Sequence, residues 1–176
     1  MKALNFLLTA IFAATIAQPL AAIDLNKGEN RIARAARHEI LSLPYLDVFD
    51  NITLRVDGET VTLMGQVTRP ALKDDAGNAV KGIEGVGNVV NQIEVLPLSP
   101  FDDRLRISLY HSIYGYSSLE RYALPVIKPI RIIVKNGHVT LEGVVNNESD
   151  RNVVNIRAHG VHGVFSVTNN LRVEKD

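Results

Sequence analysis

The 176-residue sequence contains neither cysteine nor tryptophan, and aromatic residues make up only 6% of it. Without cysteine the chain can form no disulfide, so it must fold by packing alone, although many small secreted domains depend on disulfides. A zinc site built on cysteine is excluded for the same reason. Apart from the first residues, no stretch is long and apolar enough to span a bilayer.

The sequence also lacks a net charge, because 19 basic residues balance 19 acidic ones. This balance argues against a nucleic-acid-binding protein. The two halves differ, however. Residues 23–97 carry eight basic and eleven acidic side chains, whereas residues 98–176 carry ten and eight. The mild positive bias of the second half is the one electrostatic hint about a partner.

The first 22 residues have the pattern of a secretory signal. Lys2 precedes an apolar run over residues 3–17, and small residues offer a cleavage site after Ala22. The run is shorter than the roughly 20 apolar residues of a membrane span, so we favour cleavage over an uncleaved anchor helix. No cysteine follows this site, so we do not expect a lipoprotein anchor. These features predict a soluble, exported protein.

One segment of the sequence occurs twice. Residues 56–67 return as residues 134–145, and the offset of 78 positions continues without a gap to the end of both copies. Several glycine, valine and asparagine positions match at this offset; among them are Gly82 with Gly160, Gly85 with Gly163, Val89 with Val167 and Asn91 with Asn169. One supersecondary unit is therefore present twice, and we expect a first repeat over 23–97 and a second over 98–176.

Periodicity predicts the same element order in both repeats. In the first, we expect a helix over 30–42, a hairpin turning at Asp57 and Gly58, a helix from Pro70 to about Gly82, and a last strand over 86–96. A helix between two strands allows the last strand to lie parallel to one arm of the hairpin. The predicted fold class is α+β, with two tandem αββαβ repeats, each a three-stranded mixed sheet packed by two helices.

The second repeat differs mainly near its first helix. We expect this helix to begin near Asp102 and to bury Leu105, Leu109 and Ile113. It aligns with the first helix at an offset of 73, so five extra residues lie within 114–129. Asn136-Gly137 is a strong hairpin turn, and Asn147 is suited to cap the next helix.

The repeated pattern resembles the BON domain. The resemblance is carried by Val-Thr-Leu-x-Gly-x-Val, by the glycines at the end of the following helix, and by Val-x-Asn in the last strand. It is closest over residues 132–173 and covers nearly the whole chain after the signal. The resemblance implies an αββαβ fold without enzymatic activity or cofactor. It also implies export to the bacterial periplasm, and a role in osmotic stress, envelope integrity and binding of anionic phospholipid.

A tentative lipid-binding surface follows from the first helix of the second repeat and the segment after it. Tyrosine suits the headgroup zone of a membrane, and arginine pairs well with phosphate. Tyr110 and Tyr114 are one helical turn apart and share a face with Ile107. The residues expected to contact the membrane are Arg104, Arg106, Tyr110, Tyr114, Tyr116, Lys128 and Arg131. The alternative is that the rings pack against the other repeat or cover the sheet.

The sequence supports other hypotheses on function less well. The same tyrosines and arginines would suit a protein interface, so an envelope adaptor or holdase is the second hypothesis. A hydrolase is the third, but no serine lies in a nucleophile-elbow motif. His159 and His162 have helical spacing for a metal pair, yet Gly160 ends that helix and no carboxylates accompany them. We therefore expect no metal site, no cofactor and no nucleic-acid partner.

Overall fold

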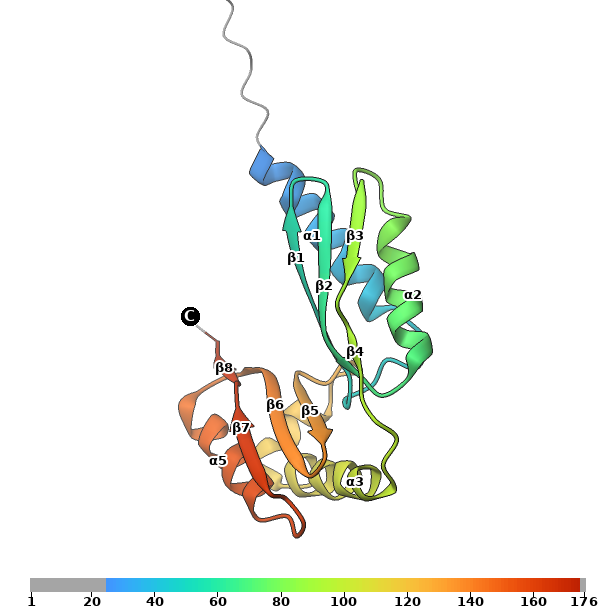
Figure 1. The fold of residues 1–176 in the computed structure, drawn as a ribbon. Helices are drawn as coiled ribbons and strands as arrows, with labels where there is room; N and C mark the ends of the chain where they lie inside the picture. Colours follow the sequence, from blue (N-terminus) through green and yellow to red (C-terminus); the bar gives the residue numbers. More distant parts are fainter. Residues whose placement is uncertain (1–24, 175–176) are drawn as a thin grey trace, which may run out of the picture.

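The computed structural model describes residues 25–174, so the expected signal over 1–22 lies outside the described residues. The described chain forms two αββαβ repeats, as the sequence predicts (Figure 1). The first repeat contains α1 (Leu25–Leu41), β1 (Asn51–Asp57), β2 (Thr60–Val67), α2 (Pro70–Lys81), β3 (Asn88–Asn91) and β4 (Glu94–Val95). The second contains α3 (Pro100–Tyr114), η1 (Ser117–Leu119), α4 (Glu120–Ala123), β5 (Ile130–Lys135), β6 (His138–Val145), α5 (Glu148–His159), β7 (Ser166–Asn169) and β8 (Arg172–Val173).

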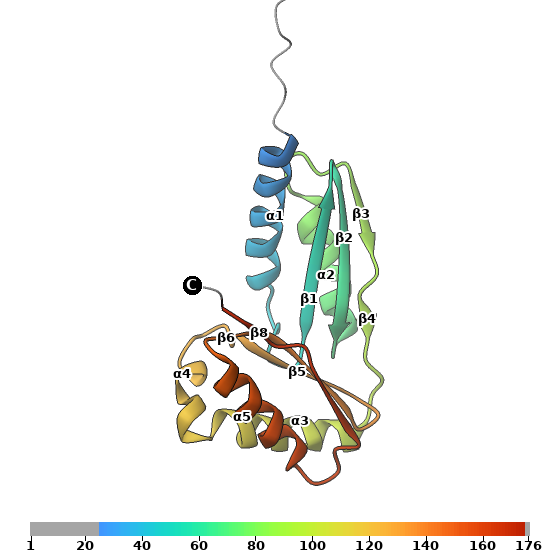
Figure 2. The same cartoon turned by 90° about the vertical axis from the view of Figure 1, so that its left-hand side faces the viewer.

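Each repeat is a mixed sheet with its hairpin on one side and its last strand on the other. Strand β2 pairs antiparallel with β1 and parallel with β3 and β4, and β6 pairs in the same way with β5, β7 and β8. Helices α3 and α5 cover one face of the second sheet, whereas α1 and α2 cover one face of the first (Figure 2). The predicted mixed sheet and its parallel last strand are confirmed.

The last strand of each repeat is broken in two by an asparagine. The side chain of Asn91 donates to the carbonyl of Lys73 on α2 at 2.7 Å, and its Oδ1 accepts from the N–H of Ile93 at 3.2 Å. Asn169 makes the corresponding contacts with the carbonyl of Arg151 and the N–H of Leu171. The matched asparagines therefore fasten the strand break to the helix beside it.

Glycine is needed where the hairpin strands approach most closely. Gly65 and Gly143 have φ of 113° and 122°, and a Cβ atom at either position would overlap the carbonyl oxygen of Asn51 or Pro129 on the neighbouring strand. The backbones of the two hairpin strands therefore approach each other closely at these two glycines. Any other residue there would combine backbone strain with a clash against backbone that cannot move independently.

An acidic residue near the start of each first helix fastens the hairpin turn. In the second repeat, both carboxylate oxygens of the buried Asp102 accept backbone N–H groups, from Asn136 and Gly137, at 2.8 Å. In the first repeat, the carboxylate of Glu29 accepts from the N–H of Gly58 at 3.0 Å. Glu29 aligns with Asp102 at the helix offset of 73, so the repeats join helix and hairpin in the same way.

The start of α1 differs from expectation, and the segment over 114–129 contributes further helical elements. Helix α1 begins at Leu25 rather than near residue 30. The sequence did not reveal its first turns, because these are polar and show no apolar stripe. The segment over 114–129, in which the five extra residues lie, contains η1 and α4. Leu119 and Tyr122 from this segment are buried in the core of the second repeat.

The two repeats meet where the connection between α1 and β1 reaches the second sheet. Val48 packs in the core of the second repeat, and its carbonyl accepts from the N–H of Ile132 at 2.9 Å. The guanidinium of Arg131 donates to the carbonyl of Asp47 at 2.6 Å. In the same connection of the first repeat, the fully buried Asp50 accepts from the N–H and the hydroxyl of Thr68. The contacts between the repeats are thus partly apolar and partly hydrogen-bonded.

Candidate functional site

Helix α3 carries most of the residues predicted to bind lipid. Ser99 caps its N-terminus by accepting from the N–H of Asp102 at 3.2 Å, and Pro100 occupies the first turn. Leu105, Leu109 and Ile113 face the sheet, as predicted, and are buried. The direction of this stripe decides which of the other side chains reach solvent.

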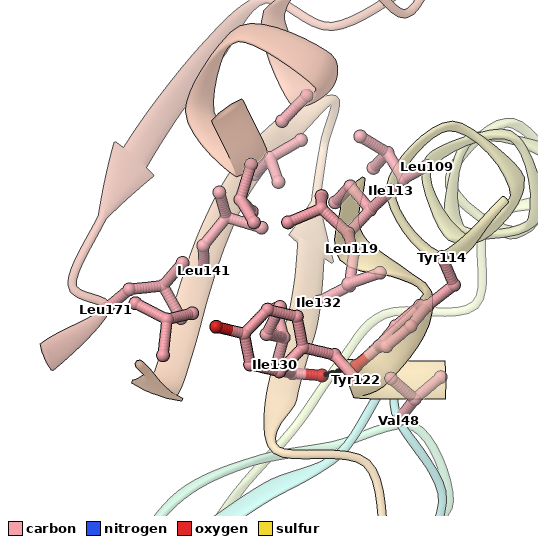
Figure 3. Close-up of a cluster of buried hydrophobic side chains, with 14 of the residues drawn as sticks. Val48, Leu109, Ile113, Tyr114, Leu119, Tyr122, Ile130, Ile132, Leu141 and Leu171 are labelled. Carbon is pink, nitrogen blue, oxygen red and sulfur yellow. Dashed lines mark hydrogen bonds between the residues drawn. The ribbon is translucent and has the colours of Figure 1, made fainter. Parts of the chain in front are cut away.

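Two of the predicted lipid contacts are buried, and for them the prediction of an exposed surface is wrong. Arg106 donates to the carbonyl of Val134 at 2.7 Å and to the carboxylate of Asp103 at 2.5 Å. The hydroxyl of Tyr114 donates to the carbonyl of Ile130 at 2.6 Å. Figure 3 shows Tyr114 between α3 and β5, beside Val48 and Ile130. Both side chains reach around the sheet to satisfy the outer carbonyls of its edge strand.

The surroundings of Tyr114 make it a structural residue. Burial raises the pKa of its phenol far above the ordinary value, although the nearby Arg131 opposes this shift. The ring of Tyr110 packs on Tyr114 with centroids 5.0 Å apart and meets the edge of Phe49 from the first repeat at 6.4 Å. Tyr110 is therefore only half-exposed. The alternative reading, in which these rings pack against the other repeat and the sheet, describes both tyrosines.

The two basic residues after the helix are also engaged. The Nζ atom of Lys128 donates to the carbonyls of Ala123 and Pro125, at 2.8 and 2.7 Å, and so closes the loop that follows α4. Arg131 holds the contact with Asp47 between the repeats, and partial burial lowers the pKa of its guanidinium. Both basic groups therefore have structural partners, which the sequence did not indicate.

Arg104 and Tyr116 are the predicted contacts that the structure leaves exposed. Arg104 lies on the solvent side of α3 and has no carboxylate partner among the described residues. Tyr116 stacks with the guanidinium of Arg157 on α5, 4.9 Å from the ring centroid. The hydroxyl of Ser112 and the Nε atom of Arg157 donate to each other's backbone carbonyls at 2.9 Å, so the two helices are joined beside this pair.

Exposed apolar side chains accompany these charges. Ile107 on α3 is 53% exposed and Ile156 on α5 is 68% exposed. We call the outer side of the two helices the helical surface, and it consists of Arg104, Ile107, His111, Tyr116, Ile156 and Arg157. Sequence reasoning missed the contribution of α5. Its signal was present, since Ile156 falls outside the buried stripe of Val154 and Ala158.

The carboxylates of these helices are all bound by neighbours. On α3, Asp102 is buried under the hairpin turn and Asp103 pairs with Arg106. On α5, Glu148 pairs with Arg151, and Asp150 accepts from the hydroxyl of Tyr122 at 2.6 Å. Burial raises the pKa of the Tyr122 phenol, and the carboxylate of Asp150 adds to the rise. Arg104 and Arg157 consequently remain without an opposing negative charge on the helical surface.

A second exposed apolar segment follows α4. Leu124 is 77% exposed and Val126 is 98% exposed, in the loop that Lys128 closes. This loop lies within the segment that carries the five extra residues of the second repeat. Sequence reasoning identified the segment by its length and its tyrosines but did not identify these aliphatic residues.

Within residues 25–174, no cluster of three acidic or histidine side chains could hold a metal ion, and no helix is long and apolar enough to cross a membrane. His159 contacts the carbonyl of Asn155, one turn earlier on α5, and His162 is exposed. The buried carboxylates of Asp50, Asp102 and Asp150 serve backbone and side-chain donors that hold the fold.

A comparison with protein families matches the BON domain to residues 28–97 and 117–175. No curated protein matches the chain. Among solved structures, the chain is similar to two structures of CdsD, a structural protein of the Type III secretion system of Chlamydia trachomatis. One of the two is a structure of the C-terminal domain of CdsD. Both are 14% identical, with TM-scores of 0.28 and 0.29; 81% and 82% of this chain and 96% and 94% of those chains are covered. Likenesses at this level carry no functional argument.

The two family matches fall on the two repeats and together span well over half of the sequence. The first match covers an αββαβ unit apart from the start of α1, whereas the second begins after α3 and covers α4, the hairpin, α5 and the last strand. The repeated glycines and the matched Asn91 and Asn169 have the same structural roles in both copies. This chain therefore belongs to the BON domain family.

Proposed function

We propose that this chain is a non-enzymatic protein of the bacterial periplasm that binds anionic phospholipid peripherally and supports the envelope under osmotic stress. The family is associated with the envelope and with phospholipid binding. The pattern of a secretory signal over residues 1–22 supports export and release as a soluble protein.

One observation supports the assignment of lipid binding to the helical surface. On the helical surface, Arg104 and Arg157 lack carboxylate partners, while every carboxylate of α3 and α5 is engaged. Exposed Ile107 and Ile156 lie on the same two helices. Guanidinium groups bind lipid phosphates, and the aliphatic side chains enter the boundary between headgroups and acyl chains.

The strength of binding follows from the small number of charges. A basic residue near an anionic membrane contributes about 1 kcal/mol, and this attraction decays within a Debye length of about 8 Å at physiological salt. Two arginines and two isoleucines therefore give reversible binding that weakens as salt is added. This behaviour differs from that of an inserted helix, which salt does not release.

Liposome co-sedimentation tests the proposal. The chain should pellet with vesicles that contain phosphatidylglycerol and stay in solution with vesicles of phosphatidylcholine alone. Arg104→Ala should weaken binding by about fivefold, since about 1 kcal/mol is lost. Arg55→Ala is the matched control, because Arg55 is exposed on β1 of the first repeat and has no ion-pair partner within residues 25–174.

Two results would contradict the proposal: equal pelleting with both kinds of vesicle, or an equal loss in the Arg55 and Arg104 variants. A double variant, Leu124→Ser with Val126→Ser, separates the helical surface from the apolar loop. If this variant alone abolishes pelleting, the membrane contact lies at the loop and the assignment to α3 and α5 is wrong.

A further inference from the structure

Each hairpin of the molecule contains one edge strand, and the two edge strands differ in whether their outward backbone groups are hydrogen-bonded. In the second repeat, the outward-facing backbone groups of β5 are bonded at three successive alternate residues. The carbonyl of Ile130 accepts from Tyr114, the N–H of Ile132 donates to Val48, and the carbonyl of Val134 accepts from Arg106. These contacts close the edge against pairing with another strand.

The matching strand β1 has no such contacts. Its residues Ile52, Leu54 and Val56 align with Ile130, Ile132 and Val134, and they have the same register against β2. No hydrogen bond among the described residues reaches their outward N–H and C=O groups. The positions that align with Arg106 and Tyr114 hold Ala33 and Leu41, whose side chains carry no donor.

The side chains along β1 are also more exposed than their counterparts. Ile130, Ile132 and Val134 are fully buried, whereas Ile52, Leu54 and Val56 are only half-buried. Figure 1 shows β1 at the outer side of the first sheet. A strand whose outer edge has no hydrogen-bond partner, and whose aliphatic side chains are half-exposed, provides both the hydrogen bonds and the apolar contacts that strand addition uses.

A groove of about 490 Å³ runs beside this edge. Its apolar lining consists of Ile40 and Leu41 of α1 and of Ile52 and Leu54 of β1. The remaining lining residues are polar or charged: Arg37, Thr53, Glu142, Asn170 and Arg172.

The charges in the groove are positive overall. The carboxylate of Glu142 already accepts from the side chain of Asn170 at 2.7 Å. Arg37 and Arg172 are exposed and have no ion-pair partner among the described residues. An occupant that places a carboxylate between these two guanidinium groups would form charge-assisted hydrogen bonds.

We propose that the β1 edge binds an extended segment of another protein, which adds to the first sheet beside β1 and places an acidic side chain between Arg37 and Arg172. Its backbone pairs with the free groups of Ile52, Leu54 and Val56. Alternate aliphatic side chains pack against Leu41 and the half-buried residues of β1, because successive side chains of a strand point to opposite faces. A single segment suits this edge better than a whole second copy, since residues of α1 and of the second repeat line the groove beside β1 and leave room only for a narrow occupant.

This proposal is independent of the lipid-binding surface and is tested separately. The probe is a fluorescent nine-residue peptide in which Val alternates with Thr and one central Thr is replaced by Glu. Fluorescence anisotropy should show saturable binding to the chain. Replacing the Glu of the peptide by Gln should weaken binding about tenfold, and methylating the backbone nitrogens that face β1 should abolish it.

Variants of the protein copy the closed edge onto the open one. The double variant Ala33→Arg with Leu41→Tyr introduces the two caps of β5 at aligned positions of α1, neither of which is buried. It should lose at least tenfold in peptide affinity and should still pellet with anionic vesicles. Arg104→Ala should behave in the opposite way, with intact peptide binding and weakened lipid binding.

Hydrogen exchange gives a second readout, because the amide of Leu54 should exchange rapidly in the free protein and slowly with peptide bound. The proposal is overturned if the peptide does not bind, if the methylated peptide binds equally well, or if the capped variant keeps full affinity. It is also overturned if the chain dimerises and the capped variant is monomeric, because the edge would then pair with a second copy.

Discussion

The two repeats share a hairpin, a second helix and a last strand, and they differ in the first helix and in the contacts made by their edge strands. The hairpin, the second helix and the broken last strand agree at an offset of 78, down to the asparagine contacts of the break. The first helix and the connection after it do not. Arg106, Tyr114 and Val48 close the edge of β5, while β1 is left open. The shared part therefore defines the fold, and the divergent part determines which surfaces remain for partners.

The largest effect should come from truncating the matched core residues Leu63 and Leu141, which are fully buried at aligned positions. Each change to Ala should lower the free energy of unfolding by about 2–5 kcal/mol through lost burial and a cavity. Denaturant unfolding with a fluorescent probe in each repeat measures which unit is affected. If the repeats unfold as separate units, each variant shifts the transition of its own repeat. A single transition that shifts equally in both variants would show that the contacts through Val48 couple them.

A smaller effect should distinguish the capped edge of β5 from the open edge of β1. Tyr114→Phe removes the donor to the carbonyl of Ile130 and leaves that buried oxygen unpaired, so it should cost about 1–3 kcal/mol. The matched change in the first repeat is Leu41→Tyr, at a position that is 37% exposed. It should leave stability nearly unchanged or raise it slightly by capping the carbonyl of Ile52. Thermal unfolding of both variants checks this, and a loss in Leu41→Tyr as large as that in Tyr114→Phe would contradict the equivalence of the two edges.

The sequence was a good guide to the shared unit because its signals are local. Gly65 and Gly143 mark close approaches of two backbones, and Pro70 and Asn147 mark helix starts that the structure confirms. Because the two copies align at an offset of 78, each of these elements can be predicted from two sequences. Two matching copies make a chance pattern improbable, so the element order could be predicted with few errors.

The burial of Arg106 and Tyr114 could not be predicted from the sequence, because the signals that determine it are not local. Helical spacing places Tyr110, Tyr114 and Ile107 on neighbouring positions, but it cannot show that the first repeat covers one side of α3. It also cannot show that Arg106 and Tyr114 are long enough to reach the outer carbonyls of β5. Burial of a side chain of this kind depends on which element lies beside the helix, and the order of elements along one repeat does not contain that information.

The smallest expected effect concerns the contacts between the repeats and depends on pH. Burial raises the pKa of Asp47 above its ordinary value of 3.8, and the neighbouring Asp50 adds to the rise, although the N–H of Phe49 and Arg69 oppose it. Between the unfolded and folded pKa values the folded state keeps a proton that the unfolded state has lost. Stability from this group is thus fully present below pH 3.8 and is lost as pH rises through the folded pKa.

Asp47→Asn removes this titration while keeping an oxygen that can accept from the N–H of Phe49 at the present 2.8 Å. The variant should therefore gain unfolding free energy relative to the unchanged chain as pH rises from 3 to 7. Urea unfolding at both pH values measures the difference. A gain that is the same at pH 3 and pH 7 would mean that the substitution acts through packing, and a loss that grows toward pH 7 would mean that the carboxylate is stabilised by Arg69 and Arg131 more than burial penalises it. In the second case the contact between the repeats would depend on an ion pair, and added salt should loosen it along with the hydrogen bond from Arg131 to the carbonyl of Asp47.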